Sequence, residues 1–130
     1  MSNQGITYII TSKKRQTLEE TLESIAENAD ITYINSTSPE ILINPYPLVK
    51  YHLNYERFDN LRQLVEYVEN IKDHVVIIED LSVLLERSSN INETNYLLVQ
   101  LVKQLYTHTS FLLDVKRIEF IALMVDKAIN

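Results

Sequence analysis

Hydrophobic residues along the chain alternate between short β-branched runs and longer stretches with helical spacing. The clearest run is Val-Val-Ile-Ile at residues 75–78, which follows His74 and ends at the acids Glu79 and Asp80. A short, fully apolar run is typical of a strand buried on both faces, as in the middle of an α/β sheet. The two acids would then lie at the carboxyl end of this strand, where open α/β sheets bind their ligands.

The other predicted strands and helices follow the same two patterns. Runs rich in β-branched and aromatic residues predict strands at residues 6–11, 31–35, 41–43, 48–53 and 111–113. Apolar residues spaced i, i+3, i+4 and i+7 predict helices at residues 17–26, 58–71 and 94–107. Thr17 and Glu20 form a capping box that is expected to begin the first helix, and Asn90 can cap the third.

Two local features add to this pattern. Pro45 and Pro47 prevent a central ladder around Tyr46, so a reverse turn is predicted between strands 41–43 and 48–53. The first strand, helix and strand have the spacing of a βαβ unit, which pairs its two strands in parallel. The chain is therefore predicted to be an α/β protein with three layers, in which a mixed, mostly parallel sheet carries helices on both faces.

The C-terminal stretch admits two interpretations. Residues 119–125 could form a buried strand, but the apolar residues from Ile118 to Ile129 also recur with helical spacing. Alanine, leucine and methionine favour a helix, and Asp114 could cap it. We predict a helix over residues 117–129 and keep the strand as the alternative.

Length and composition narrow the possible functions. The 130 residues, 45% hydrophobic and 23% charged, fit one domain over residues 1–130. A single glycine disfavours a phosphate-cradling loop, and the absence of cysteine rules out disulfides. No apolar run approaches the length of a membrane span, so no membrane contact is expected. Since the net charge is −6, strong DNA binding by the chain alone is not expected.

Candidate catalytic and metal-binding residues receive structural interpretations. Glu79 and Asp80 could bind a divalent cation, but neighbours on a strand point to opposite faces, so we interpret them as acids at a solvated strand end. Lys13, Lys14 and Arg15 follow the first strand, but the P-loop signature is absent and we interpret them as a solvated loop. They form the one basic cluster and are the candidate DNA-contacting residues. No metal, cofactor or catalytic residue is predicted.

The last predicted helix carries more apolar residues than one buried face requires. A terminal helix that is apolar nearly all round is either deeply buried or covered by a partner. Its apolar residues and the neighbouring strand therefore supply the predicted partner-binding residues, which are Phe111, Ile118, Phe120, Leu123 and Met124.

The order of predicted elements resembles the XPF-type nuclease domain. In that family a strand pair carries glycine-aspartate-tyrosine and then glutamate-arginine-lysine, and the next helix starts with aspartate and leucine. The corresponding places here hold Asn44-Pro45-Tyr46, Glu56-Arg57-Phe58 and Asp59-Asn60-Leu61. Proline thus replaces the metal-binding aspartate and phenylalanine replaces the catalytic lysine, so the residues for two-metal phosphodiester cleavage are incomplete.

The resemblance implies a degenerate, non-catalytic partner subunit. The chain is similar to the ERCC-type subunit or to the small subunit of the meiotic crossover pair. Such a subunit forms a heterodimer with a larger XPF-like protein and contacts branched DNA only through the complex, during recombination or repair. The expected location is the nucleus, or the cytoplasm of a prokaryote. The family's helix-hairpin-helix tail is not expected in residues 1–130.

Two alternatives remain open. The first is a RecA- or KaiC-like core without its phosphate loop, which would act as an adaptor and would place a strand at residues 119–125. The second is an active metal-dependent nuclease that uses Glu56, Glu79 and Asp80.

Overall fold

A single parallel sheet organises the computed structural model, which describes residues 5–25, 29–36, 50–72, 75–125 and 127–129. Within these ranges the strand order is β3-β2-β4-β5-β1-β6, and every pair is parallel. The strands are β1 (Gly5–Ile10), β2 (Ile31–Asn35), β3 (Asn54–Glu56), β4 (Val75–Glu79), β5 (Thr109–Asp114) and β6 (Lys127–Ile129). The helices are α1 (Lys14–Glu23), α4 (Leu61–Asn70), α5 (Leu81–Glu86), α6 (Ile91–Leu105) and α7 (Glu119–Ala122).

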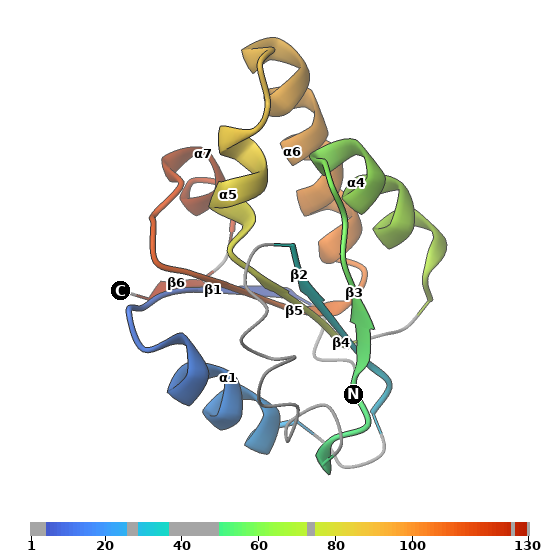
Figure 1. The fold of residues 1–130 in the computed structure, drawn as a ribbon, viewed down its shortest axis with the longest axis vertical. Coiled ribbons are helices and arrows are strands. Elements are labelled where there is room, and N and C mark those ends of the chain that lie inside the picture. Colours follow the sequence, from blue (N-terminus) through green and yellow to red (C-terminus); the bar gives the residue numbers. More distant parts are fainter. Residues whose placement is uncertain (1–4, 26–28, 37–49, 73–74, 126, 130) are drawn as a thin grey trace.

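Helices cover both faces of the sheet. Helix α1 lies on one face, while α4, α5, α6 and α7 lie on the other (Figure 1). This arrangement confirms the predicted three-layer α/β fold, with a parallel sheet throughout the described strands. No helix within the described ranges is long and apolar enough to cross a membrane.

The central strand β4 divides the hydrophobic core in two. Val76 and Ile78 join the larger cluster beneath α4 and α6, whereas Ile77 joins the smaller cluster beneath α1. All three side chains are at most 1% exposed, which confirms the predicted strand buried on both faces. The smaller cluster is completed by Leu18, Leu22, Ile31, Tyr33 and Leu113.

Helix α4 forms where its apolar spacing predicts it. Its residues at i, i+3, i+4 and i+7 from Leu61 are all buried against the sheet. The side chain of Asn60 accepts a hydrogen bond from the backbone N–H of Gln63 at 3.0 Å and so caps the first turn. Asn90 caps α6 in the same way through Glu93, as predicted.

The capping box predicted at Thr17 is wrong. Helix α1 begins at Lys14, so Thr17 lies inside the helix and its hydroxyl donates to the carbonyl oxygen of Lys13 at 2.9 Å. The turn before the helix depends instead on Thr11, whose hydroxyl accepts from the N–H of Lys13 at 3.0 Å. The loop between β1 and α1 is therefore only three residues long.

The strand predicted at residues 48–53 is wrong for its described part. Residues 50–53 are not extended strand, and the strand starts at Asn54, where it pairs in parallel with β2. The predicted strand 41–43, the turn at 44–47 and residues 48–49 lie outside the described residues. Pairing with β2 gives residues 54–56 backbone partners at the edge of the sheet.

The helix predicted over residues 117–129 is also wrong. Helix α7 spans four residues, and the chain then forms β6, which pairs with β1 through Thr7 and Ile9. The hydroxyl of Tyr106 donates to the carbonyl of Met124 at 2.7 Å, just where the helix has ended. Pairing with β1 satisfies that strand's outer edge, which a continuous helix would leave without a neighbour. The alternative strand at residues 119–125 is wrong as well, because residues 119–122 form α7 and the strand starts only at Lys127.

Candidate functional site

The chain reverses its winding direction between the adjacent strands β1 and β5. After β1 the chain crosses one face of the sheet through α1 to reach β2, and after β5 it crosses the other face through α7 to reach β6 (Figure 1). Open α/β sheets bind ligands at such switch points, outside the carboxyl ends of the strands. Three acidic residues end strands near this place, and we treat their surroundings as the candidate site.

An ion pair with a buried carboxylate links α1 to the end of β4. The Nζ atom of Lys14, the first residue of α1, lies 2.6 Å from Oδ2 of Asp80, which follows β4. The Asp80 side chain is 4% exposed and the Lys14 side chain 21%. A carboxylate removed from water to this extent is stabilised only where an opposite charge and hydrogen bonds replace the lost hydration.

The backbone at Asp80 turns directly from a strand into a helix. Its φ and ψ angles are 61° and 40°, a left-handed conformation that asparagine and aspartate adopt more readily than most residues. The N–H of Asp80 donates to the carbonyl of Leu113 at 2.9 Å, so the link to β5 persists beyond the last residue of β4. This single-residue turn aims the carboxylate toward the start of α1.

Asp114 holds the start of α5 from the neighbouring strand. Its Oδ2 atom accepts from the N–H of Ser82 at 2.9 Å, and its Oδ1 atom accepts from the Ser82 hydroxyl at 2.7 Å. Oδ1 also accepts from the N–H of Lys116 at 3.1 Å. Since Asp114 is 1% exposed, these donors replace its hydration and tie the ends of β4 and β5 together.

Glu79 belongs to a separate buried network on the α1 face. Its carboxylate accepts a hydrogen bond from the hydroxyl of Tyr33, which in turn accepts from Nδ2 of Asn35 at 3.0 Å. Burial, followed by the negative charge of Glu79, raises the pKa of Tyr33 well above its usual range. Tyr33 therefore keeps its proton and remains a donor to the carboxylate.

The three acids of the candidate site are bound by donors of the chain itself. Across the described ranges, no group of three histidines or acids is positioned to hold a metal ion. Chemically, the site joins α1, β2, β4, β5 and α5 through charge and hydrogen bonding, and its donors are already directed at its own carboxylates.

Two interpretations of sequence motifs are corrected here. Glu79 and Asp80 are not solvated, because they are only 6% and 3% exposed, although they do point to different partners as expected. The basic cluster of Lys13, Lys14 and Arg15 is not a solvated loop either, because Lys14 is in α1 and its side chain contacts Asp80. Arg15 pairs with Glu19 along α1 at 3.1 Å, and Lys13 is exposed. The three candidate DNA-contacting residues thus have three different environments.

The residues of the nuclease alternative do not meet. Glu56 on β3 lies opposite Ile34, whose other neighbour is Ile78 on β4. Two strand spacings, about 10 Å, therefore separate the backbone at Glu56 from β4. Phe58, which stands at the position of the family's lysine, packs against Tyr67 with ring centroids 5.1 Å apart and ring planes tilted by 46°.

The predicted partner-binding residues fall into two groups. Phe111 lies on the α1 face of β5, and Ile118 and Met124 pack partly against the larger core. Phe120 and Leu123 on and after α7 are exposed, at 37% and 85%. Phe111 lies on β5 and only Phe120 lies within the short helix α7, so the five residues do not share one helical surface.

Sequence reasoning missed the roles of Ser82, Asp114 and Tyr33. One signal was available: Asp114 ends an apolar run in the same way as Glu79 and Asp80, which places all three acids at one edge of a parallel sheet. No local pattern pairs Lys14 with Asp80, which lies 66 residues away. No family model matches this sequence, and a search of curated proteins finds no match.

Proposed function

We propose that the chain is a non-catalytic interaction subunit built on the core of a nucleotide-binding α/β protein. The observation that carries this proposal is the Lys14–Asp80 ion pair. In P-loop proteins a lysine at the end of the first loop contacts the phosphates, and an aspartate after another strand holds magnesium. Here a lysine and an aspartate in comparable places bind each other.

The short loop before α1 supports the same proposal. Thr11, Ser12 and Lys13 connect β1 to α1 without glycine, so their backbone lacks the conformational freedom with which a P-loop wraps phosphate. The N–H of Thr11 already donates to the backbone carbonyl of Asp114, and the N–H of Lys13 donates to the hydroxyl of Thr11. These features favour the RecA- or KaiC-like core without a phosphate loop, although the strand that follows β5 is β6 and not the expected strand at residues 119–125.

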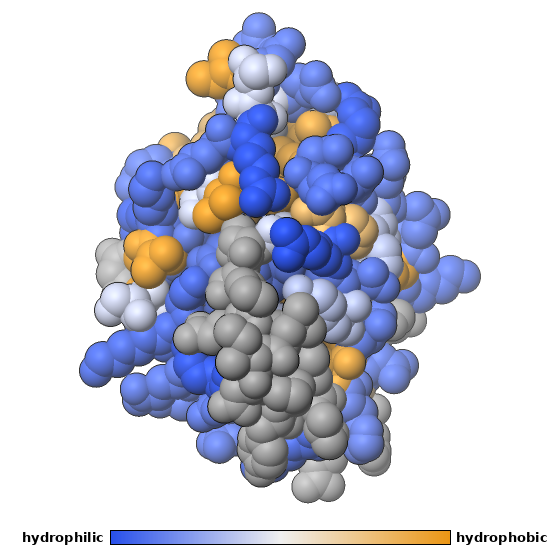
Figure 2. Space-filling view, viewed as in Figure 1, coloured by the Kyte–Doolittle hydropathy of each residue, from blue (hydrophilic) through white to orange (hydrophobic). Residues whose placement is uncertain are grey.

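The larger XPF-like protein remains the proposed partner suggested by sequence resemblance. Phe58 has a packing role at the position where that family places its catalytic lysine, which fits a non-catalytic subunit in either family. In this proposal branched DNA is contacted through the complex, because Lys14 and Arg15 are engaged with acids of the chain. Figure 2 shows a mostly hydrophilic face on which hydrophobic residues are exposed in small groups.

The segment around α7 is the proposed partner surface. Leu123 is 85% exposed, and Val115 and Phe120 are 51% and 37% exposed. The segment is held in place because the hydroxyl of Tyr8 accepts from the N–H of Ile118 at 2.7 Å. An exposed leucine forgoes roughly 1.5–3 kcal/mol of burial, so a fixed apolar surface of this kind favours covering by a partner.

The pure chain is expected to show no turnover of ATP or of branched DNA. Flap and Y-form DNA with magnesium or manganese, and ATP with magnesium, are incubated with the chain and the products are quantified. The physical reason is that the groups that would contact phosphate and metal are bound to each other. Turnover that disappears in Asp80→Asn and in Glu56→Gln would contradict the proposal and favour the enzyme alternatives.

Phe120→Asp and Leu123→Asp are expected to abolish binding to the copurifying partner while leaving the free chain folded. Both side chains are at the surface, so the charge costs little within the monomer. Partner binding is measured by pull-down from the native cell, and folding by circular dichroism. Glu66→Lys on α4 is the control and should bind normally. A folded Leu123→Asp variant that still binds places the interface elsewhere.

A further inference from the structure

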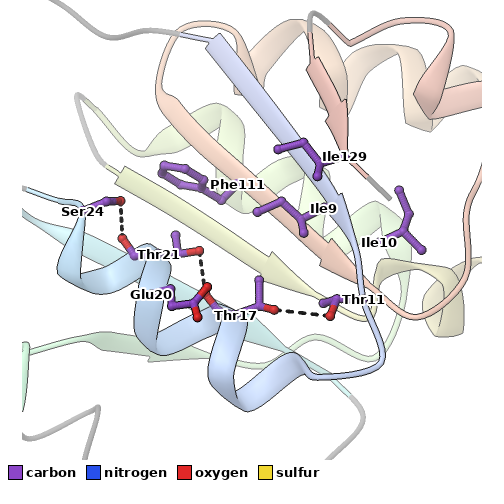
Figure 3. Close-up of a pocket in the computed structure, with 9 residues that line it drawn as sticks. All are labelled: Ile9, Ile10, Thr11, Thr17, Glu20, Thr21, Ser24, Phe111 and Ile129. Atoms are coloured by element: carbon purple, nitrogen blue, oxygen red, sulfur yellow. Dashed lines mark hydrogen bonds between the residues drawn. The ribbon is translucent and has the colours of Figure 1, made fainter.

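A groove of about 440 Å³ lies between α1 and the outer strands β1 and β6 (Figure 3). It is on the face of the sheet opposite α4, α5, α6 and α7. The groove is lined by Ile9, Ile10, Thr11, Thr17, Glu20, Thr21, Ser24, Phe111 and Ile129. It contains neither the Lys14–Asp80 pair nor the exposed residues of α7.

The floor of the groove contains Ile9 and Ile129, which belong to an apolar row that becomes more exposed toward the sheet edge. The parallel register aligns Leu113 on β5 with Ile9 on β1 and with Ile129 on β6. Leu113 is fully buried beneath α1, Ile9 is partly exposed, and Ile129 is 39% exposed. Helix α1 thus covers the inner strands, and no other helix of the described ranges lies over β1 and β6 on this face.

The wall of the groove is a polar stripe on α1. Thr17, Glu20, Thr21 and Ser24 lie at i, i+3, i+4 and i+7, so they share one face of the helix. The hydroxyls of Thr21 and Ser24 donate to backbone carbonyls at 2.8 and 2.6 Å, and the hydroxyl of Thr17 lies within hydrogen-bond distance of the Lys13 carbonyl and of the Thr11 hydroxyl. What these hydroxyls can still offer is their lone pairs, so the stripe acts as an acceptor surface.

Glu20 adds a negative charge to this acceptor surface. Its Oε1 atom accepts from the side-chain amide of Gln16 at 3.0 Å, and that neutral donor leaves the carboxylate charge in place. An apolar floor beside an acidic acceptor wall matches a ligand that combines apolar groups with cationic donors. Lysine and arginine side chains have this chemistry.

The architecture indicates the shape of the occupant. Parallel sheets occur almost only where helices cover both faces, since their strands are apolar on both sides. The place over β1 and β6 that no described helix occupies is beside α1, where a further helix would complete the layer. A helix can present an apolar stripe to the floor and a charged flank to α1 at the same time.

We propose that this groove binds an amphipathic helix of the partner protein, with its apolar stripe on Ile9 and Ile129 and with lysine or arginine facing Glu20. The inference rests on the proposed interaction function and specifies a second contact besides α7. Binding completes the helical layer over β1 and β6 and neutralises part of the chain's negative charge.

The test uses a phage-displayed library of helical peptides selected against the whole chain. Enriched peptides are expected to carry apolar residues at i, i+3, i+4 and i+7 with lysine or arginine along one flank. Fluorescence anisotropy then measures their dissociation constants. We expect Glu20→Lys to weaken binding about tenfold by charge reversal, and Ile129→Asp to weaken it at least as much. Glu69→Lys, an equal charge change on α4, should have no effect.

Several results would overturn the inference. Peptides that are acidic, or that bind Glu20→Lys as tightly as the unmodified chain, exclude a cationic helix in the groove. Failure to enrich any peptide counts against it as well. Self-association of the chain in sedimentation, lost in Ile129→Asp, would assign the groove to a second copy. Because Glu20 is exposed, its variant tests the groove even if Ile129→Asp disturbs β6. The proposed function fails separately, through catalytic turnover.

Discussion

Replacing Lys14 with alanine is expected to lower the free energy of unfolding by about 3 kcal/mol. The substitution leaves the Asp80 carboxylate in a place where its side chain is 4% exposed, without the cation that lies 2.6 Å away. Removing one partner of a buried pair costs more than the pair itself contributes, since the remaining charge loses its compensation. Urea-induced unfolding followed by circular dichroism provides the measurement.

Two further variants separate the buried charge from general damage to α1. Lys13→Ala, at the exposed neighbouring position, should change the unfolding free energy by less than about 0.5 kcal/mol. Adding Asp80→Asn to Lys14→Ala should restore much of the stability, because asparagine is neutral and tolerates the left-handed backbone. If Lys14→Ala is as stable as Lys13→Ala, the ion pair is not an important part of the site.

Asp114→Ala is expected to have an effect of similar size, about 4 kcal/mol. Three donors lose their acceptor: the N–H and hydroxyl of Ser82, and the N–H of Lys116. Hydrogen bonds to a charged acceptor contribute roughly 1.5–3 kcal/mol each, and the three are not additive because they share one carboxylate. The unfolding free energy is measured in urea, and hydrogen exchange at the Ser82 amide reports local loss of the cap.

Ser82→Ala is the matched comparison for Asp114→Ala. It removes the hydroxyl donor but keeps the backbone N–H bond to Asp114, so the expected cost is about 1–2 kcal/mol. Amide exchange at residue 82 should then remain slow. An Asp114→Ala variant that is no less stable than Ser82→Ala would show that the cap of α5 contributes little.

Strong periodicity explains which elements the sequence predicted correctly. Strand β2 and the central strand β4 lie where their β-branched runs indicated, and α4 and α6 follow their apolar spacing. Each of these elements buries a complete face, so the same residues decide both the local conformation and the packing. Asn60 and Asn90 cap their helices through contacts only three residues long, which a sequence pattern can represent.

The candidate site could be predicted only in outline. A pair of acids after a buried strand correctly indicated the carboxyl edge of the sheet, but not that both acids are buried. Burial of Asp80 depends on Lys14, and the cap of α5 depends on Asp114 from another strand. These contacts join residues that are 66 and 32 positions apart, so their existence follows from the strand order and not from any local spacing.

The amino-acid sequence alone determined the α/β class, the buried central strand and the helices with a single apolar face, because periodicity and capping act within a few residues. The tertiary structure decided the last segment, whose residues have both helical spacing and strand propensity. There the open edge of β1 offered backbone partners to residues 127–129, and Tyr106 engaged the carbonyl of Met124. It also decided the ion pair, since a charge is buried only where the fold brings its counterion.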